Sequence, residues 1–226
     1  MEYTNHNSIK PTYNGSLSYG WEKMKSHFLY LFLVVLVISI LDTPLKLLEE
    51  GNMDKSSLSI LLQVFGMAYW LLFLPIIDYS ADLIFIQAVR NEKIDLKNII
   101  LGFKSYLNIV LVHLLVTALV GIATIALIIP GIIVACRLAF VSYLVMDKHL
   151  DPITAVETSW RMTKGHGWRI FGLGVTSLFI FIFGLILFIV GVFPALIWIK
   201  ASFAALYQGV INENDADERA VVKEVG

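Results

Sequence analysis

Six apolar runs in this chain are close in length to what is needed to cross a membrane, and they constrain its fold more than any other feature. A transmembrane helix needs roughly 20 apolar residues, because only helices and closed barrels satisfy their own backbone hydrogen bonds in hydrocarbon. The runs cover residues 28–48, 58–90, 106–129, 132–146, 168–193 and 195–211. We therefore predict an all-α polytopic transmembrane bundle with six spans.

Prolines indicate how these runs are joined. Pro130, followed by Gly131, and Pro194 each separate two runs that otherwise continue directly, and such positions are typical of tight turns between antiparallel helices. Pro75 lies inside the second run, where we expect a kink. The sequence thus predicts three successive helical hairpins.

Polar segments flank the apolar region at both ends. Residues 1–26 form a polar N-terminus without a short apolar core and cleavage site, so we expect no cleavable signal peptide. Residues 27–211 form the predicted six-span domain, and residues 212–226 form an acidic tail that we expect to be frayed or disordered.

The distribution of Lys and Arg predicts the orientation. In short connections these residues favour the cytoplasmic side of a membrane. Most of them lie in connections on one side of the predicted bundle: Lys23, Lys25, Arg90, Lys93, Lys97, Lys104, Lys148, Arg161, Lys164 and Arg169. Only Lys46 and Lys55 accompany the acidic segment on the other side. The other side carries the acidic segment 49–54 and two uncharged proline turns. We therefore expect both termini in the cytoplasm.

Composition excludes several classes of protein. Apolar residues make up 58% of the chain and charged residues only 15%, whereas about a quarter of an ordinary globular domain is charged. The net charge of −1 gives no electrostatic footprint for a nucleic acid. Cys136 is the only cysteine, so neither an intrachain disulfide nor a thiolate metal cage is expected.

A weak internal repeat relates the last two predicted hairpins. Aligning Pro130 with Pro194 places Tyr143 against Tyr207 and brings Arg137 within one position of Lys200. Each of the three hairpins is also preceded by a short segment in which an aromatic residue adjoins charge. These segments predict three lead-in helices at the cytoplasmic interface.

The third lead-in helix has the clearest boundaries. Asp151 is a suitable N-cap, Pro152 suits the first helical position and Gly165 can end the segment. The second lead-in helix is expected to follow Asp95. Such helices either bind anionic lipid or only anchor the hairpins. The lipid-contact candidates are Trp21, Phe103, Trp160, Arg161, Lys164, Trp168 and Arg169.

Ionisable residues inside the predicted spans are candidates for a site, because they are costly in a membrane. From a rise of about 1.5 Å per residue, Asp78 and the two cations Arg137 and Lys200 are expected at similar depth. Asp82 shares a helix face with Asp78. We predict a buried charge cluster of Asp78, Asp82, Arg137 and Lys200, which is either a clasp that holds the hairpins together or a transport site.

No catalytic motif accompanies these charges. We find no paired-histidine zinc motif, nucleophile elbow, P-loop or acidic motif of lipid synthases, so we expect no enzyme activity, metal or cofactor. An alternative is an intramembrane enzyme in which Asp78 and Asp82 share a proton. His113, in the third span, is expected to hydrogen-bond to a neighbouring helix.

Three motifs resemble a known family. The stretch NEKIDLKNIILGFKSYLNIV at 91–110, the IPGII turn at 129–133 and VETSWRMTKGHGWRIFGL at 156–173 are similar to bacterial membrane proteins of the DUF975 and YciC-like group. That group is related to the membrane domain of some glycerophosphodiester phosphodiesterases. The resemblance implies six spans in a bacterial cytoplasmic membrane and no established activity. Asp78 departs from it, because a small residue is expected there.

Small extramembrane mass, aromatic-basic lead-in helices and missing catalytic motifs together favour an accessory, scaffold or lipid-interacting protein. Its expected partners are membrane lipids and either another membrane protein or a second copy of the chain, but no nucleic acid. The alternative is a small secondary transporter or lipid translocator that uses the buried charges of spans two, four and six.

Overall fold

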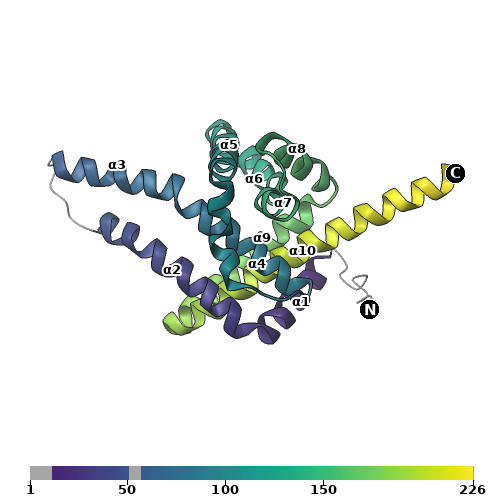
Figure 1. Cartoon of the computed structure of the whole chain (residues 1–226), viewed down its shortest axis with the longest axis horizontal. Helices are drawn as coiled ribbons and strands as arrows, with labels where there is room; N and C mark the ends of the chain where they lie inside the picture. Colours follow the sequence, from purple (N-terminus) through teal and green to yellow (C-terminus); the bar gives the residue numbers. More distant parts are fainter. Residues whose placement is uncertain (1–11, 51–56, 226) are drawn as a thin grey trace.

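The computed structural model describes the backbone of residues 12–50 and 57–225 and the side chains of residues 12–42, 60–187 and 191–216. In these ranges every regular element is a helix, which confirms the all-α prediction (Figure 1). The predicted acidic segment 49–54 lies outside the described side chains. The helices are α1 Tyr13–Ser26, α2 Phe28–Glu50, α3 Ser57–Leu72, α4 Leu74–Val89, η2 Leu96–Ser105, α5 Tyr106–Ala126, α6 Ile128–Arg137, α7 Val141–Lys148, α8 Pro152–Met162, α9 Gly167–Ile186 and α10 Phe188–Val225.

Several helices have the length and apolar character of membrane spans. In the described part of the chain, five segments meet this requirement, and a sixth does if α1 and α2, which meet at a bend of 96°, form one broken span. The second of the predicted runs is a single long segment, 60–89, divided at Phe73 into α3 and α4. The break lies two residues before Pro75, which accounts for the expected kink.

Apolar side chains cover the outside of the molecule. Ile125 on α5 is 88% exposed, and the outward faces of α3 and α9 are equally apolar. A water-soluble monomer rarely exposes a continuous apolar patch of more than a few hundred Å². An apolar exterior over long helices is instead what contact with lipid requires, and it agrees with a membrane protein.

Helices α4 and α10 form the centre of the molecule. Most of α4 is buried, and so are most residues of α10 between Ala195 and Ile211. They contact each other, and α1, α2, η2 and α7 pack around one or both of them. Figure 1 shows this centre, with α2 and α3 extending together from one side and the end of α10 from the other.

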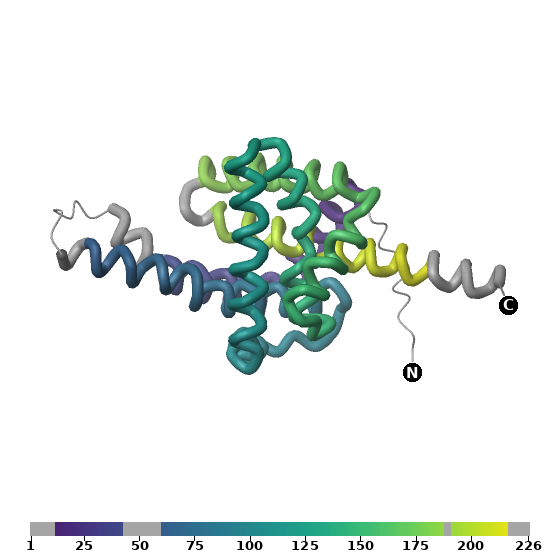
Figure 2. Tube along the Cα trace, turned by 90° about the horizontal axis from the view of Figure 1, so that it is seen from above, coloured from purple at the N-terminus to yellow at the C-terminus, as the bar shows by residue number. Residues whose placement is uncertain are grey.

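The last two predicted hairpins are present as α5–α6 and α9–α10, but their turns lie at other residues than predicted. Helix α5 packs on α6, and α9 packs on α10. Figure 2 shows α5 and α6 side by side, running across the direction of α3. The helix breaks fall at Leu127 and Leu187, so Pro130 and Pro194 lie inside helices. Pro130 is in the first turn of α6, where its missing N–H leaves no helical hydrogen bond unmade.

Glycines let helices α9 and α10 approach each other closely. A Cβ atom at Gly184 would lie 2.8 Å from the carbonyl oxygen of Gly191, so neither position has room for a larger residue. Gly174, in contrast, has open space around it. The small residues of α9 therefore permit close packing only at its C-terminal end.

The predicted fourth span is broken in the middle. Helix α6 ends at Arg137 and α7 begins at Val141. Ser159 on α8 is fully buried beside this break, where its hydroxyl donates to the Arg137 carbonyl (2.8 Å) and accepts from the Phe140 amide (3.3 Å). Broken helices persist inside membrane proteins where other groups satisfy the freed backbone atoms, and α8 supplies those groups here.

The predicted lead-in helices are present as α1, η2 and α8. The Asp151 carboxylate accepts from the Thr154 amide at 3.1 Å, as its predicted role of N-cap requires. Hydrogen bonds from the Thr154 hydroxyl and amide lower the pKa of Asp151. Asp95 caps η2 in the same way, and Gly165 has a positive φ of 90° beyond α8.

The acidic tail is helical rather than frayed. Helix α10 continues without a break to Val225, and Figure 1 shows it extending past the rest of the molecule. Glu213 near the start of the tail accepts from His166 (3.1 Å) and Arg169 (3.2 Å) of the α9 region. The Ala, Glu, Lys and Arg content of the tail also favours a helix, a local preference that the compositional prediction of disorder ignored.

Candidate functional site

Lys200 on α10 joins both aspartates of α4. Its ammonium group lies 3.1 Å from the Asp82 carboxylate, to which it donates a hydrogen bond, and 3.5 Å from Asp78. The side chain of Asp82 is 11% exposed and that of Asp78 is 49% exposed. The predicted meeting of spans two and six is therefore present, with one buried carboxylate and one that is open to its surroundings.

Arg137 does not join this cluster, so that part of the prediction is wrong. Within the described residues its guanidinium group makes no ion pair or hydrogen bond, and it lies over the Trp160 ring at 5.8 Å from the centroid. A depth estimate gives the position of a residue along its helix but not the direction of its side chain. That direction depends on the end of α6 at Arg137, and no residue of the apolar run 132–146 indicates that a helix ends there.

A second charged network was not predicted. The guanidinium group of Arg90 makes two hydrogen bonds with the Asp147 carboxylate, at 2.6 and 2.8 Å, and a third with the Gln208 side chain at 2.7 Å. The Tyr207 hydroxyl donates to Asp147 at 3.0 Å. This network ties the ends of α4 and α7 to α10. The sequence did offer one indication of this network, because Asp147 follows the apolar run 132–146 and Arg90 ends the run 58–90.

The repeat partners Tyr143 and Tyr207 stack on each other. Their ring centroids are 5.0 Å apart with an interplanar angle of 20°, and both rings are buried. The alignment of the two prolines thus pairs residues that meet at the centre of the molecule.

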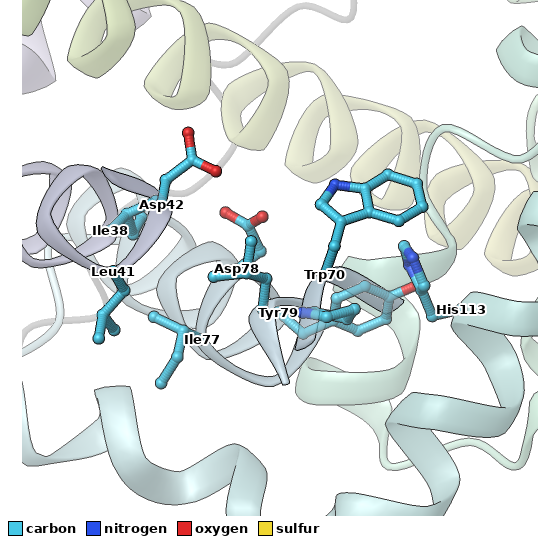
Figure 3. A pocket seen from close by; sticks show the side chains of 10 residues that line it. Ile38, Leu41, Asp42, Trp70, Ile77, Asp78, Tyr79 and His113 are labelled. Carbon is cyan, nitrogen blue, oxygen red and sulfur yellow. The ribbon is translucent and has the colours of Figure 1, made fainter. Parts of the chain in front are cut away.

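A cavity of about 270 Å³ lies beside the open carboxylate of Asp78. Helices α2 to α5 supply its walls: Ile38, Leu41, Asp42, Trp70, Leu74, Pro75, Ile77, Asp78, Tyr79 and His113. Figure 3 shows Asp78 between Asp42 on one side and Trp70 and His113 on the other. The Nε2 atom of His113 is buried and makes no hydrogen bond, so the predicted bond to a neighbouring helix is not made there.

A second hollow of about 580 Å³, the α6–α9 groove, lies between those two helices. Its walls are largely apolar, and Arg137 is its only charged lining residue in the described part of the chain: Ile129, Ile132, Ile133, Cys136, Arg137, Gly165, Gly167, Trp168 and Phe171. The Nη1 atom of Arg137 is buried and has no hydrogen-bond partner among the described residues. The groove thus combines a long apolar wall with one partly buried cation, of which one nitrogen is unsatisfied.

The predicted lipid-contact residues differ in their surroundings. Trp168 is 85% exposed, and Phe103, Arg161 and Lys164 are also exposed. Trp21 packs edge-on against Trp198 while about half of it stays exposed. Arg169 is held by Glu213, and Trp160 lies beneath Arg137. Trp168 and Phe103 also contact the rings of Phe171 and Phe73, so most of these residues have partners among the described residues.

The described residues contain no group of three or more His, Cys, Asp or Glu side chains that could hold a metal ion. No protein-family model, curated protein or solved structure matches the chain. The resemblance to the DUF975 and YciC-like group therefore rests on the quoted motifs alone and stays a prediction.

Proposed function

We propose that this chain is a lipid-interacting accessory protein of a bacterial cytoplasmic membrane, with both termini in the cytoplasm, and that its α6–α9 groove binds an anionic phospholipid. One observation carries the proposal: the buried Nη1 atom of Arg137 has no protein partner at an otherwise apolar groove. The Arg137 side chain is partly buried and has no counter-charge among the described residues, so an anionic ligand would stabilise it.

The chemistry of the groove fits a phospholipid better than a soluble anion. A guanidinium group presents several donors in a plane that matches phosphate oxygens. Ile129, Ile132 and Phe171 provide the apolar surface that an acyl chain requires. The volume of about 580 Å³ lies within the usual range of ligand sites, which is roughly 300–1,000 Å³.

The end of the groove near α8 is suited to a headgroup. Gly165 and Gly167 have open space where a side chain would project. Lys164, next to them, and Arg161 are exposed cations. Trp168 is an amphipathic residue of the kind that is enriched at the level of lipid headgroups. These features support a headgroup near Arg137 and a chain along α6.

The alternative, a small secondary transporter or lipid translocator, is favoured by one observation. Asp78 opens into a cavity while its neighbour Asp82 stays buried against Lys200. Arg137 lies outside this cluster, so any transport through it would use the charges of spans two and six only.

Native mass spectrometry of gently extracted protein tests the lipid proposal. We expect wild-type protein to retain one phosphatidylglycerol in preference to phosphatidylcholine from a mixed membrane. Arg137→Gln should lose that preference, because it removes the cation of the groove. Lys93→Gln is the matched control, since it removes one positive charge at an exposed position that does not line the groove.

Retention of the anionic lipid by Arg137→Gln at the wild-type level would show that the groove is not the site. Wild-type protein without any retained lipid would contradict the lipid-interacting class itself. The same spectra report whether a second copy of the chain or another protein is bound.

A further inference from the structure

The cavity beside Asp78, which the lipid proposal does not use, has the lining of a cation site. Asp78 contributes an open carboxylate from α4, and Asp42 on α2 also lines the cavity. Trp70 and Tyr79 contribute aromatic rings, and His113 contributes an imidazole. The remaining lining residues are apolar. Such a lining combines negative charge, aromatic surface and an apolar wall around one cavity (Figure 3).

Charges of the cluster favour a positively charged ligand. In the described part of the chain, Lys200 is the single cation that contacts Asp78 and Asp82, and its hydrogen bond goes to Asp82. These two carboxylates and one ammonium group carry a net charge of −1. In the low dielectric between apolar helices an added cation is attracted strongly to that excess charge.

His113 gives an independent indication of what the ligand must offer. Its Nε2 atom is buried and makes no hydrogen bond within the described residues. The imidazole ring lies edge-on to Trp70 at 6.1 Å and to Tyr79 at 6.3 Å, so its position is restricted by packing. Buried nitrogen atoms without a partner are rare, and the neutral ring can accept at Nε2 from an N–H donor.

These features select among cations. A calcium ion takes six or more oxygen ligands, and no group of three acidic, His or Cys side chains occurs in the described part of the chain. An ammonium group needs fewer partners, since it donates hydrogen bonds and is attracted to aromatic faces. We propose that the cavity binds a small protonated primary alkylamine, with Asp78 as its counter-ion, His113 as an acceptor and Trp70 and Tyr79 around its charge.

Calorimetric titration of the full chain in phosphatidylcholine nanodiscs with butylammonium chloride tests this proposal. We expect saturable binding that potassium chloride does not reproduce. Asp78→Asn should weaken it about tenfold or more, because it removes the charge-assisted hydrogen bond. Glu92→Gln is the matched control, since it makes the same chemical change at an exposed position and should bind like wild type.

A second pair of measurements tests the geometry without altering the charge cluster. Tetramethylammonium has the same charge but no N–H group, so wild type should bind it more weakly than butylammonium. His113→Leu should weaken butylammonium selectively, and Trp70→Leu, at a half-exposed position, should weaken both cations.

Absence of saturable binding of butylammonium to wild type would overturn the proposal, as would equal binding by Asp78→Asn and wild type. The result is separable from the lipid proposal, because Arg137→Gln should bind butylammonium like wild type. If Asp78→Asn does not fold, the proposal would be overturned by His113→Leu and Trp70→Leu variants that both bind butylammonium with wild-type affinity.

Discussion

At the scale of single residues, the main feature of this protein is the unequal partnering of its ionisable side chains. Lys200 is shared by Asp78 and Asp82, and Arg90 is fully engaged by Asp147 and Gln208. Arg137 has no such partner. Two of these charged groups are therefore compensated within the described residues, and the third, Arg137, is the group to which we assign an anionic lipid.

Double-mutant cycles distinguish these environments. We expect Asp82→Asn and Lys200→Gln to be coupled by about 1–3 kcal/mol in the free energy of unfolding, because the two groups are in direct contact. Asp78→Asn and Arg137→Gln should instead be additive, since the structure separates them. Reversible unfolding in mixed detergent micelles measures both. Additive effects in the first cycle would refute the contact between α4 and α10.

At the scale of elements, the break between α6 and α7 links the fold to the candidate lipid site. The break redirects the chain immediately after Arg137, and α8 secures it through Ser159 and Thr163. Thr163 also bonds within α8, whereas the Ser159 hydroxyl bonds only across the interface to Arg137 and Phe140. Ser159 is therefore the clearest test of this junction.

Ser159→Ala should lower the free energy of unfolding by about 1–3 kcal/mol, because it leaves the Phe140 amide without a partner and the Arg137 carbonyl with only the longer bond from Thr163. Ser177→Ala is the matched control. The Ser177 hydroxyl is also buried but bonds only to the Leu173 carbonyl of its own helix, so its loss should have little effect. Equal destabilisation by both substitutions would show that the junction does not depend on α8.

Sequence reasoning found most helices but not their breaks. Asp151 and Pro152 predicted the start of α8 because caps are local chemistry, and apolar runs predicted the long helices. The division after Arg137 could not be predicted, because it depends on hydroxyls that arrive from α8. Pro130 and Pro194 led to turns being predicted where the helices continue. A helix accepts proline in its first turn and tolerates it elsewhere when packing compensates.

At the scale of the whole molecule, the arrangement is a buried centre with an apolar exterior. Helices α4 and α10 hold the charged networks, and α3, α5 and α9 present apolar side chains outward. The predicted meeting of Lys200 with the aspartates followed from depth alone, because depth is fixed by the rise of a helix. The cavity at Asp78 and the α6–α9 groove could not be predicted, because each needs residues from several helices in specific orientations.

Photo-crosslinking with an anionic phospholipid that carries a photoreactive acyl chain tests the central claim most directly, because it reports membrane embedding and groove occupancy together. Mapped by peptide mass spectrometry in native membranes, the crosslinks should concentrate in 129–137 and 165–171 and decrease in Arg137→Gln but not in Lys93→Gln. Crosslinks spread evenly over the exposed faces of α3, α5 and α9, and unchanged by Arg137→Gln, would contradict a lipid site in the α6–α9 groove.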